Sequence, residues 1–333
     1  MLKKIYRKLV YAAYKKYAPI RERKVRKAMA FKRKLGANKT YPQSSATVEE
    51  LHEELRRAGL KSGDTVFVRA SLSAAMYIKG GVPAFLDGLK SYFSEGNIMM
   101  SSYTFNKSPI MFLADNPLFD PETSRDQLNL VSEFFRCSEG VVRSIHPTHS
   151  VVAWGKDAHW LTKDHHKSSF CYAENSPFAR LYELDAKELS FGVFPTSLSY
   201  HFIEQFVPQG QPTYRDFESP VMCRVMIDGQ EQILPFKATN AFTAIMDRDD
   251  KIIGTDAEPE KHFLSNDLDY YIFYLNPQLS ALKGIIKEYG SYHYVTSHLK
   301  NFILKYIARP LVLTAYYDKV DGCLHPVKKD VQA

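Results

Sequence analysis

The chain has 333 residues, of which 45% are hydrophobic and 24% charged; this ordinary globular usage predicts a substantial core in one large α/β domain or roughly two domains. Its four scattered cysteines (Cys137, Cys171, Cys223 and Cys323) form no C-x-x-C pair, which disfavours a disulfide framework and favours a reduced, cytoplasmic protein. The net charge of +7 is uneven: residues 1–36 hold fourteen Lys and Arg against one acid, a local +13, so residues 37–333 carry −6 and a nucleic-acid-binding core is not supported.

Residues 1–40 are predicted to form a basic amphipathic helical arm. In MLKKIYRKLVYAAYKKYAPI, apolar residues such as Leu2, Ile5 and Leu9 recur at helical spacing, and Lys and Arg lie off that stripe. Charges interrupt the apolar run too early for a secretory signal or for a membrane span, which needs about 20 apolar residues. Such an arm suits the anionic inner face of a membrane, at about 1 kcal/mol per Lys or Arg. The alternative is a solvated helix that packs on the body or on a second copy of the chain in a homodimer.

The body, residues 41–333, alternates helix and strand patterns. Thr47 and Glu50 form a capping box ahead of the apolar stripe of Leu51 and Leu55. The run TVFVRA predicts a buried strand, and the turn Asp228-Gly229 between alternating flanks predicts a β-hairpin over residues 219–242. This alternation predicts an α/β layered fold around a central mixed sheet. Further helices are predicted at 83–93, 128–137 and early in 298–317, and further strands at 97–105, 150–155, 188–193 and late in 298–317.

Two histidines flank a proline in RSIHPTHSVVAWG, residues 143–155. Pro147 prevents the helix that would place His146 and His149 on one face. The residue types alone leave metal ligation, acid–base chemistry and packing open. No metal is expected, because the spacing to the later histidines, His159, His165 and His166, reproduces no zinc pattern.

Two other motifs indicate chemistry. Gly80 and Gly81 open a predicted helix whose amides could hold a phosphate, although the Walker lysine and the three-glycine dinucleotide pattern are missing. His201 and Glu204, in TSLSYHFIEQF, are i, i+3 neighbours on one helical face. A carboxylate there fixes the imidazole tautomer and leaves the other ring nitrogen as a base. The alternative is a histidine at a helix start with an incidental glutamate nearby.

Several segments, taken in order, resemble the aminoglycoside N-acetyltransferases that acylate the 3-amino group, with their antibiotic-acetyltransferase fold. They are GDTVFVRASLS, GGVPAFLDGL, FDPETS, GVVRSIHPTHSVVAWG, ENSPFARLYELDAKELSFGV and TSLSYHFIE, within about residues 47–206, and a weaker similarity continues in LKGIIKEYGSYHYVTSHLKNFI. The resemblance implies a layered α/β/α fold after the arm. It also implies direct transfer of an acetyl group from acetyl-CoA to a sugar amine, without a covalent acyl-enzyme.

The resemblance further implies which residues form the site. His201 is expected to be the general base, oriented by Glu204. His149 is expected to be a further catalytic residue that shapes the thioester end of the cleft, and His146 is expected to hold the turn. Coenzyme contacts are expected from Ser71, Ser73, Gly80, Gly81, Ser150 and Ser176, and substrate contacts from Tyr103, Thr196 and Lys237.

Lys237 departs from the family pattern, because it stands where the resistance enzymes commonly carry an acidic pair; Asp247, Asp249 and Asp250 could substitute from the next turn. A lysine there would repel a polycationic aminoglycoside and suit an anionic, nucleotide-linked or lipid-linked amino sugar. The first expectation is therefore an N-acetyltransferase of surface-polysaccharide (O-antigen or capsule) biosynthesis. The alternatives are a resistance enzyme that acetylates aminoglycosides, a catalytically decayed scaffold at the membrane surface, and O-acylation or another acyl-CoA.

Overall fold

The computed structural model describes residues 45–105, 109–193, 197–206, 220–237, 259–265, 267–289, 315–318 and 323–326. The arm predicted over residues 1–40 lies outside these ranges, and so do Thr196 and the aspartates at 247, 249 and 250. Within the described ranges, no helix combines the length and the apolar character needed to cross a bilayer.

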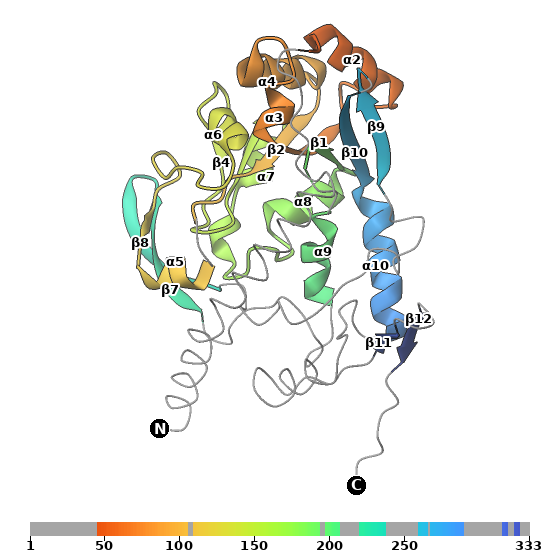
Figure 1. The fold of residues 1–333 in the computed structure, drawn as a ribbon. Coiled ribbons are helices and arrows are strands. Elements are labelled where there is room, and N and C mark those ends of the chain that lie inside the picture. The colour runs from red at the N-terminus through yellow and green to blue at the C-terminus, as the bar shows by residue number, and fades with distance from the viewer. Residues whose placement is uncertain are drawn as a thin grey trace, which may run out of the picture.

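A seven-stranded mixed sheet in the order β4-β5-β2-β1-β6-β10-β9 forms the centre of the described structure (Figure 1). Its three middle strands, β2, β1 and β6, run parallel, and an antiparallel pair extends the sheet on each side. The strands are β1 (Thr65–Ala70), β2 (Asn97–Ser101), β4 (Val142–Arg143), β5 (Val151–Gly155), β6 (Lys187–Phe191), β9 (Glu260–Leu264) and β10 (Leu268–Tyr274).

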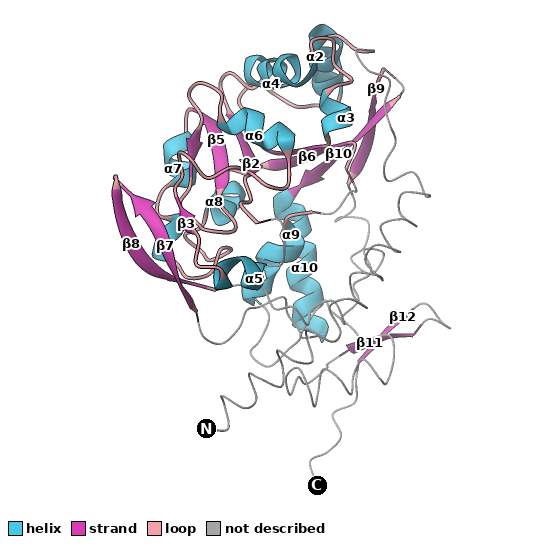
Figure 2. Cartoon of the chain, turned by 60° about the vertical axis from the view of Figure 1, so that its left-hand side comes forward, coloured by secondary structure: helices cyan, strands magenta, loops and turns pink. Residues whose placement is uncertain are grey.

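Helices cover both faces of this sheet, because successive residues of a strand point to opposite sides. In β1, Val66 and Val68 join the core beneath α2, α3, α4 and α6, whereas Phe67 joins the core shared with α7, α8, α9 and α10. Figure 2 shows α2 and α4 on one side of the sheet and α9 and α10 on the other, which confirms the predicted layered α/β/α fold. The helices are α2 (Val48–Arg57), α3 (Leu72–Ala75), α4 (Gly81–Tyr92), α6 (Leu130–Arg136), α7 (Ala158–Thr162), η1 (His165–Lys167), α8 (Pro177–Glu183), α9 (Ser199–Phe202), η2 (Ile203–Phe206) and α10 (Leu275–Tyr289).

A smaller sheet in the order β3-β7-β8 lies beside the main body (Figures 1 and 2). Its hairpin turns at Asp228 and Gly229, which both have positive φ (50° and 74°), as the Asp-Gly signal predicts. One face of the hairpin packs Val225 and Phe236 against α5 and β3. The elements are α5 (Pro109–Ala114), β3 (Leu118–Phe119), β7 (Val221–Ile227) and β8 (Gln230–Phe236), and a separate pair is formed by β11 (Ala315–Asp318) and β12 (Cys323–Pro326).

Local signals place several element boundaries correctly. The capping box is confirmed, because Thr47 Oγ1 accepts the Glu50 N–H (3.2 Å) and the Glu50 carboxylate accepts the Thr47 N–H (2.7 Å). The strand predicted over residues 97–105 is too long: β2 ends at Ser101, where its partner β5 begins directly after the His-Pro turn. The sequence pattern does not predict β9, β10 and α10, since the two strands carry charged and hydroxyl groups at several positions and show no clean apolar run.

Candidate active site

The carboxyl ends of the three parallel strands meet at one edge of the main sheet, where open α/β folds bind their ligands. β1 leads into Ser71, β2 leads toward Tyr103, and β6 is followed by the segment that carries His201. The strand order therefore collects predicted site residues from three distant parts of the sequence.

The loop between β4 and β5 is closed by an imidazole. Nδ1 of His146 accepts the backbone N–H groups of Thr148 (3.3 Å) and His149 (3.0 Å). The His146 side chain is fully buried, and burial holds its pKa well below the ordinary value, so the ring is neutral. The prediction that His146 holds the turn is confirmed, and the turn replaces the helix that Pro147 prevents.

His149 lies among aromatic rings and is almost completely buried. Its ring centroid is 5.0 Å from that of Tyr103, 5.6 Å from Phe105 and 5.7 Å from Tyr172. Its Nδ1 lies 2.8 Å from the hydroxyl of Thr148. Burial lowers the pKa of His149 to about 4, so this imidazole is uncharged near neutral pH.

His201 reaches the same place through a shared neighbour. Its half-buried ring, on α9, stacks on Tyr172 with 5.6 Å between centroids and 16° between planes. One tyrosine thus contacts both histidines that the sequence places in separate motifs. Glu204 follows in η2, but its side chain lies outside the described part of the structure, so its orienting role stays a prediction.

Two predicted substrate contacts lie near this pair. The Tyr103 ring stacks on Phe105 (5.4 Å), and burial raises the pKa of Tyr103 to about 12, so its phenol remains a hydrogen-bond donor. The Lys237 N–H donates to the carbonyl of Ser169 (2.8 Å), just after Phe236, whose ring contacts His146 (4.9 Å). The end of the hairpin is therefore held against the His-Pro loop.

Ser150 is fully buried, and its hydroxyl is used within the fold. It accepts a bond from Arg143 Nε (3.1 Å) and donates to the carbonyl of Ser102, to which Arg143 Nη2 also donates (3.1 Å). The same guanidinium donates to the carbonyl of Ser124, and burial lowers the pKa of Arg143 to about 10. The coenzyme contact expected of Ser150 stays a prediction. Its hydroxyl already has two hydrogen-bond partners within the protein.

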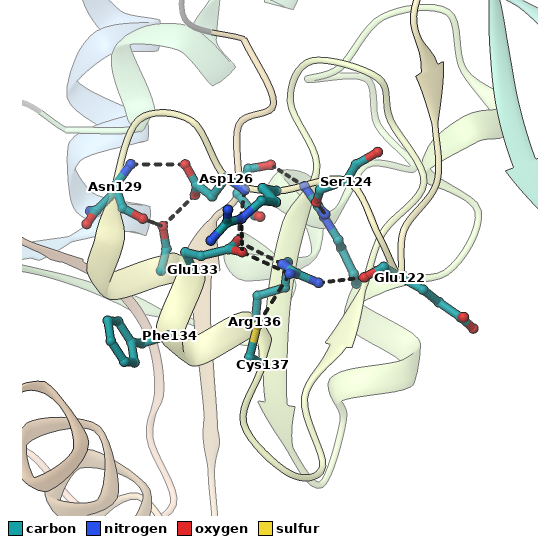
Figure 3. Close-up of polar contacts among 12 residues, drawn as sticks. Glu122, Ser124, Asp126, Asn129, Glu133, Phe134, Arg136 and Cys137 are labelled. Atoms are coloured by element: carbon teal, nitrogen blue, oxygen red, sulfur yellow. Dashed lines mark hydrogen bonds and ion pairs between the residues drawn. The ribbon is translucent and has the colours of Figure 1, made fainter.

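An ionic network fixes the loop that precedes α6 (Figure 3). Glu133 accepts two bonds from Arg136 (2.8 and 2.9 Å) and one from the Asp126 N–H (2.8 Å), and hydrogen bonding to Arg136 lowers the pKa of Glu133 to about 2. Asp126 accepts the N–H of Asn129 (3.0 Å), the residue that caps α6. Phe134 points away from this network and is 51% exposed.

An apolar pocket of about 520 Å³ lies between α6 and the start of α4. Because its lining residues come from the end of β1 onward and from α6, it borders the same sheet edge as the histidines. The lining residues are Leu72, Met76, Gly80, Gly81, Val82, Pro83, Leu130 and Phe134.

The two glycines at this pocket are required by the backbone. Gly80 and Gly81 both have positive φ (94° and 69°), and a Cβ on Gly80 would lie 2.7 Å from the Cβ of Ala84. The Gly81 N–H already donates to the carbonyl of Ile78 (2.8 Å), and Pro83 has no N–H. The first turn of α4 therefore offers fewer amide donors to a phosphate than an ordinary helix start does.

The other three predicted serines, Ser71, Ser73 and Ser176, differ in location. Ser71 caps α3 by accepting the Ala74 N–H (3.1 Å), and its hydroxyl lies 3.1 Å from that of Ser73; both residues flank the pocket residue Leu72. Ser176 instead caps α8 through the Ala179 N–H (3.2 Å) and is buried on the opposite face of the sheet from α4 and α6. The structure does not bring Ser176 together with the pocket.

Sequence reasoning missed Tyr172 and Glu188. No motif marks Tyr172, whose contacts arise from a loop. Glu188 could have been found, because a carboxylate inside an apolar strand needs a partner, and Arg69 interrupts the neighbouring strand in the same way. Among the described residues, no group of three or more His, Cys, Asp or Glu side chains is arranged to hold a metal ion.

Comparison with known proteins gives a consistent result. The family model for aminoglycoside 3-N-acetyltransferase matches residues 67–253. The SPbeta prophage-derived aminoglycoside N(3')-acetyltransferase-like protein YokD of Bacillus subtilis (strain 168) is 30% identical over 196 residues, which cover 53% of this chain and 70% of that protein. Two solved structures share the fold: aminoglycoside acetyltransferase AAC(3)-Xa (TM-score 0.60, 21% identity, 74% of this chain and 94% of that one) and AAC-IIIb in a binary complex with CoASH (TM-score 0.59, 20% identity, 73% and 97%).

Proposed function

Since this chain belongs to the aminoglycoside 3-N-acetyltransferase family, we propose that it transfers the acetyl group of acetyl-CoA to an amine of an aminoglycoside. The chain is an acyl-CoA-dependent N-acetyltransferase; the identity of the acceptor is the proposal. The relatives named above are aminoglycoside acetyltransferases or similar to them, so this acceptor takes precedence over the polysaccharide amino sugar that the sequence analysis put first.

The observation that supports this proposal most directly is the contact of both His149 and His201 with Tyr172 at the carboxyl edge of the sheet. In the proposed reaction His201 removes a proton from the acceptor ammonium. The freed nitrogen attacks the thioester carbonyl, so that a C–N bond forms and the C–S bond breaks. The nitrogen loses its second proton as the amide forms, the departing sulfur takes up a proton, and the coenzyme leaves as a thiol. A general base held in this way accelerates the reaction by about 10²–10⁴-fold.

His201 suits this role better than His149. Its ring is half-buried, whereas His149 is almost completely buried and its lowered pKa makes it a weak base. We assign His149, with Tyr103 and Phe105, to the aromatic surface against which the sugar packs. Glu204 is proposed to orient His201, as the i, i+3 spacing favours.

The apolar pocket between α4 and α6 is proposed to take the pantetheine arm of acetyl-CoA. Leu72, Leu130 and Phe134 provide the apolar contact that this arm needs, and Gly80 and Gly81 also line the pocket. Ser71, which directly follows β1, and Ser73 flank the pocket residue Leu72 and are proposed to contact the same arm.

A second candidate acceptor is an anionic amino sugar, for example a nucleotide-linked one. It is favoured by Lys237, whose backbone is fixed beside the loop that leads to Tyr172. The two acceptors make opposite demands on charge, so one panel of substrates distinguishes them.

The test is thiol release from acetyl-CoA with kanamycin-type aminoglycosides, a nucleotide-linked amino sugar and a neutral amino sugar, with mass spectrometry of each product. We expect turnover with an aminoglycoside, and His201→Ala should lower kcat by about 10²–10⁴-fold while the thermal midpoint is retained. His159→Ala, which removes an exposed histidine, is the matched control. Turnover only with the anionic sugar would select the second acceptor, and full activity of His201→Ala would overturn the assignment of the base.

A further inference from the structure

Glu188 is a fully buried carboxylate in the middle of the main sheet. It pairs with Phe67 across β6 and β1, so its side chain lies on the face that α8, α9 and α10 cover. Carboxylates are almost never fully buried unless they are paired, because removing their charge from water is costly.

The two oxygens of Glu188 have different partners. Oε1 accepts a bond from Arg69 Nη1 (3.2 Å), and Oε2 accepts the backbone N–H of Leu198 (2.7 Å). Burial raises the pKa of Glu188, whereas the charge of Arg69, the Leu198 N–H and the Ser197 side chain oppose that rise. The carboxylate thus joins a guanidinium of one strand to the segment that precedes α9.

Leu198 is the residue from which α9 starts. It has no side-chain cap to offer, and its carbonyl accepts the N–H of His201 (2.9 Å). Glu188 is therefore connected to the proposed base through a single residue, Leu198. The carboxylate accepts the Leu198 N–H, and the Leu198 carbonyl accepts the His201 N–H. Two acceptors therefore serve the start of α9: Glu188, from a neighbouring strand, binds the Leu198 N–H, and Ser197 Oγ accepts the Ser199 N–H (3.1 Å).

The other side of α9 is held by α8. The Tyr182 hydroxyl donates to Ser199 Oγ (2.9 Å), and the Tyr182 ring stacks on Phe202 at 4.3 Å. A four-residue helix has little stability of its own, so these tertiary contacts decide where it lies.

We propose that Glu188 is a positioning residue for acetyl transfer: by binding the Leu198 amide while paired with Arg69, it places the His201 imidazole against Tyr172. The inference rests on the proposed role of His201 as base. Arg69 compensates the buried charge that this arrangement requires.

The first test compares Glu188→Leu, Glu188→Gln and the double variant Arg69→Met/Glu188→Leu, with Glu183→Leu as the control for the same change at an exposed site. In Glu188→Leu, kcat should fall by about 10–100-fold with the KM for acetyl-CoA unchanged, since a displaced catalytic group costs about that much. The thermal midpoint should fall as well, because Arg69 has lost this carboxylate. Glu188→Gln keeps an acceptor for the Leu198 N–H and should recover most of kcat.

The double variant separates positioning from charge compensation. It removes both charges, so the thermal midpoint should recover while kcat stays low, because the Leu198 amide still has no acceptor from β6. If kcat recovers together with the thermal midpoint, Glu188 only neutralises Arg69 and the proposal is overturned.

The second test needs no turnover and stands even if no acceptor is found. Hydrogen exchange of the Leu198 and His201 amides, followed by NMR, should be about 10–100-fold faster in Glu188→Leu and in the double variant than in the wild type, as expected for a lost bond to a charged group. Unchanged exchange would overturn the positioning role, whereas a wild type that acetylates no amine would overturn only the proposed function.

Discussion

Single residues in the His-Pro region show how the chain keeps three imidazoles buried and neutral. The Val151 N–H donates to Ser144 Oγ (2.9 Å), which leaves the Ser144 hydroxyl to donate to Nδ1 of His165 (2.9 Å). Nε2 of His165 then carries the proton and donates to the carbonyl of Cys171 (3.0 Å). Since Cys171 precedes Tyr172, this chain of bonds also fixes the tyrosine that the two site histidines share.

These imidazoles predict a loss of stability in acid. Burial lowers the pKa of His165 to about 3 and of His149 to about 4, whereas an unfolded histidine titrates near 6.5. As the pH falls from about 7 to about 4, the unfolded chain binds protons that the folded chain does not, so the free energy of unfolding decreases. Urea unfolding at a series of pH values should show this decrease. His165→Asn should make the decrease smaller, and His159→Asn, at an exposed site, should leave it unchanged; equal pH slopes in all three proteins would contradict the account.

Among the site residues, those within local motifs could be predicted and those that depend on tertiary contact could not. His149 and His201 carry motif signals, and the proline beside His146 already favours a turn. Tyr172 has no such signal, because its position follows from η1 and from the bonds of His165. Glu188 is visible only as a charge in an apolar strand, and its partner Arg69 is 119 positions away in the sequence.

Among the elements, α6 links the ionic loop to the apolar pocket. Phe134→Ala should raise the KM for acetyl-CoA by about 10-fold with little change in kcat, because it removes apolar surface from the proposed pantetheine pocket and leaves the base in place. Leu128→Ala is the matched control, since Leu128 is as exposed as Phe134 (56% against 51%) but does not line the pocket. Steady-state kinetics with varied acetyl-CoA measure both variants. An equal rise in both, or none in either, would argue against this location of the coenzyme.

The end of β5 is predicted to tolerate no side chain. Gly155 has φ of 121°, and a Cβ there would lie 2.2 Å from the Gly96 carbonyl oxygen and 2.8 Å from the Cα of Asn97. Gly155→Ala should therefore destabilise the protein by about 3 kcal/mol, through backbone strain and displacement of β2. Gly63→Ala, where the added Cβ meets nothing within 4 Å, should change the free energy of unfolding very little. Chemical denaturation of the two variants makes the comparison, and a Gly155→Ala protein as stable as Gly63→Ala would refute it.

The elements with strong local codes were predictable: the capping box of α2, the Asp-Gly hairpin and the β-branched β1. The order of the strands was not, because neither periodicity nor capping encodes which strand lies beside which. β9 and β10 extend the sheet past β6, and their mixed polar and aromatic residues suit one buried and one partly exposed face.

Across the whole molecule, positive charge is concentrated at the N-terminal end of the sequence. Residues 1–36 carry +13 and the remainder −6, so we predict that the arm binds anionic membranes. Replacing Lys3, Lys4, Arg7 and Lys8 by Gln should weaken cosedimentation with anionic vesicles without changing acetyl transfer. The control makes the same change of charge at four exposed lysines of the body, Lys61, Lys156, Lys163 and Lys287. Vesicle binding that falls equally in both variants would show a response to net charge alone.

The parallel pairing of β1 with β6 also delays the completion of the sheet during translation, because β6 is synthesised long after β1. Arg69 leaves the ribosome 119 residues ahead of Glu188, which at about 5–20 residues per second is an interval of about 6–24 s. Throughout that interval the hydrogen-bonding edge of β1 that faces β6 is open, and β10 and β9 can join only later. An unpaired strand edge is a template for aggregation, so slow codons placed before β6 would lengthen the time for which the nascent chain carries this hazard.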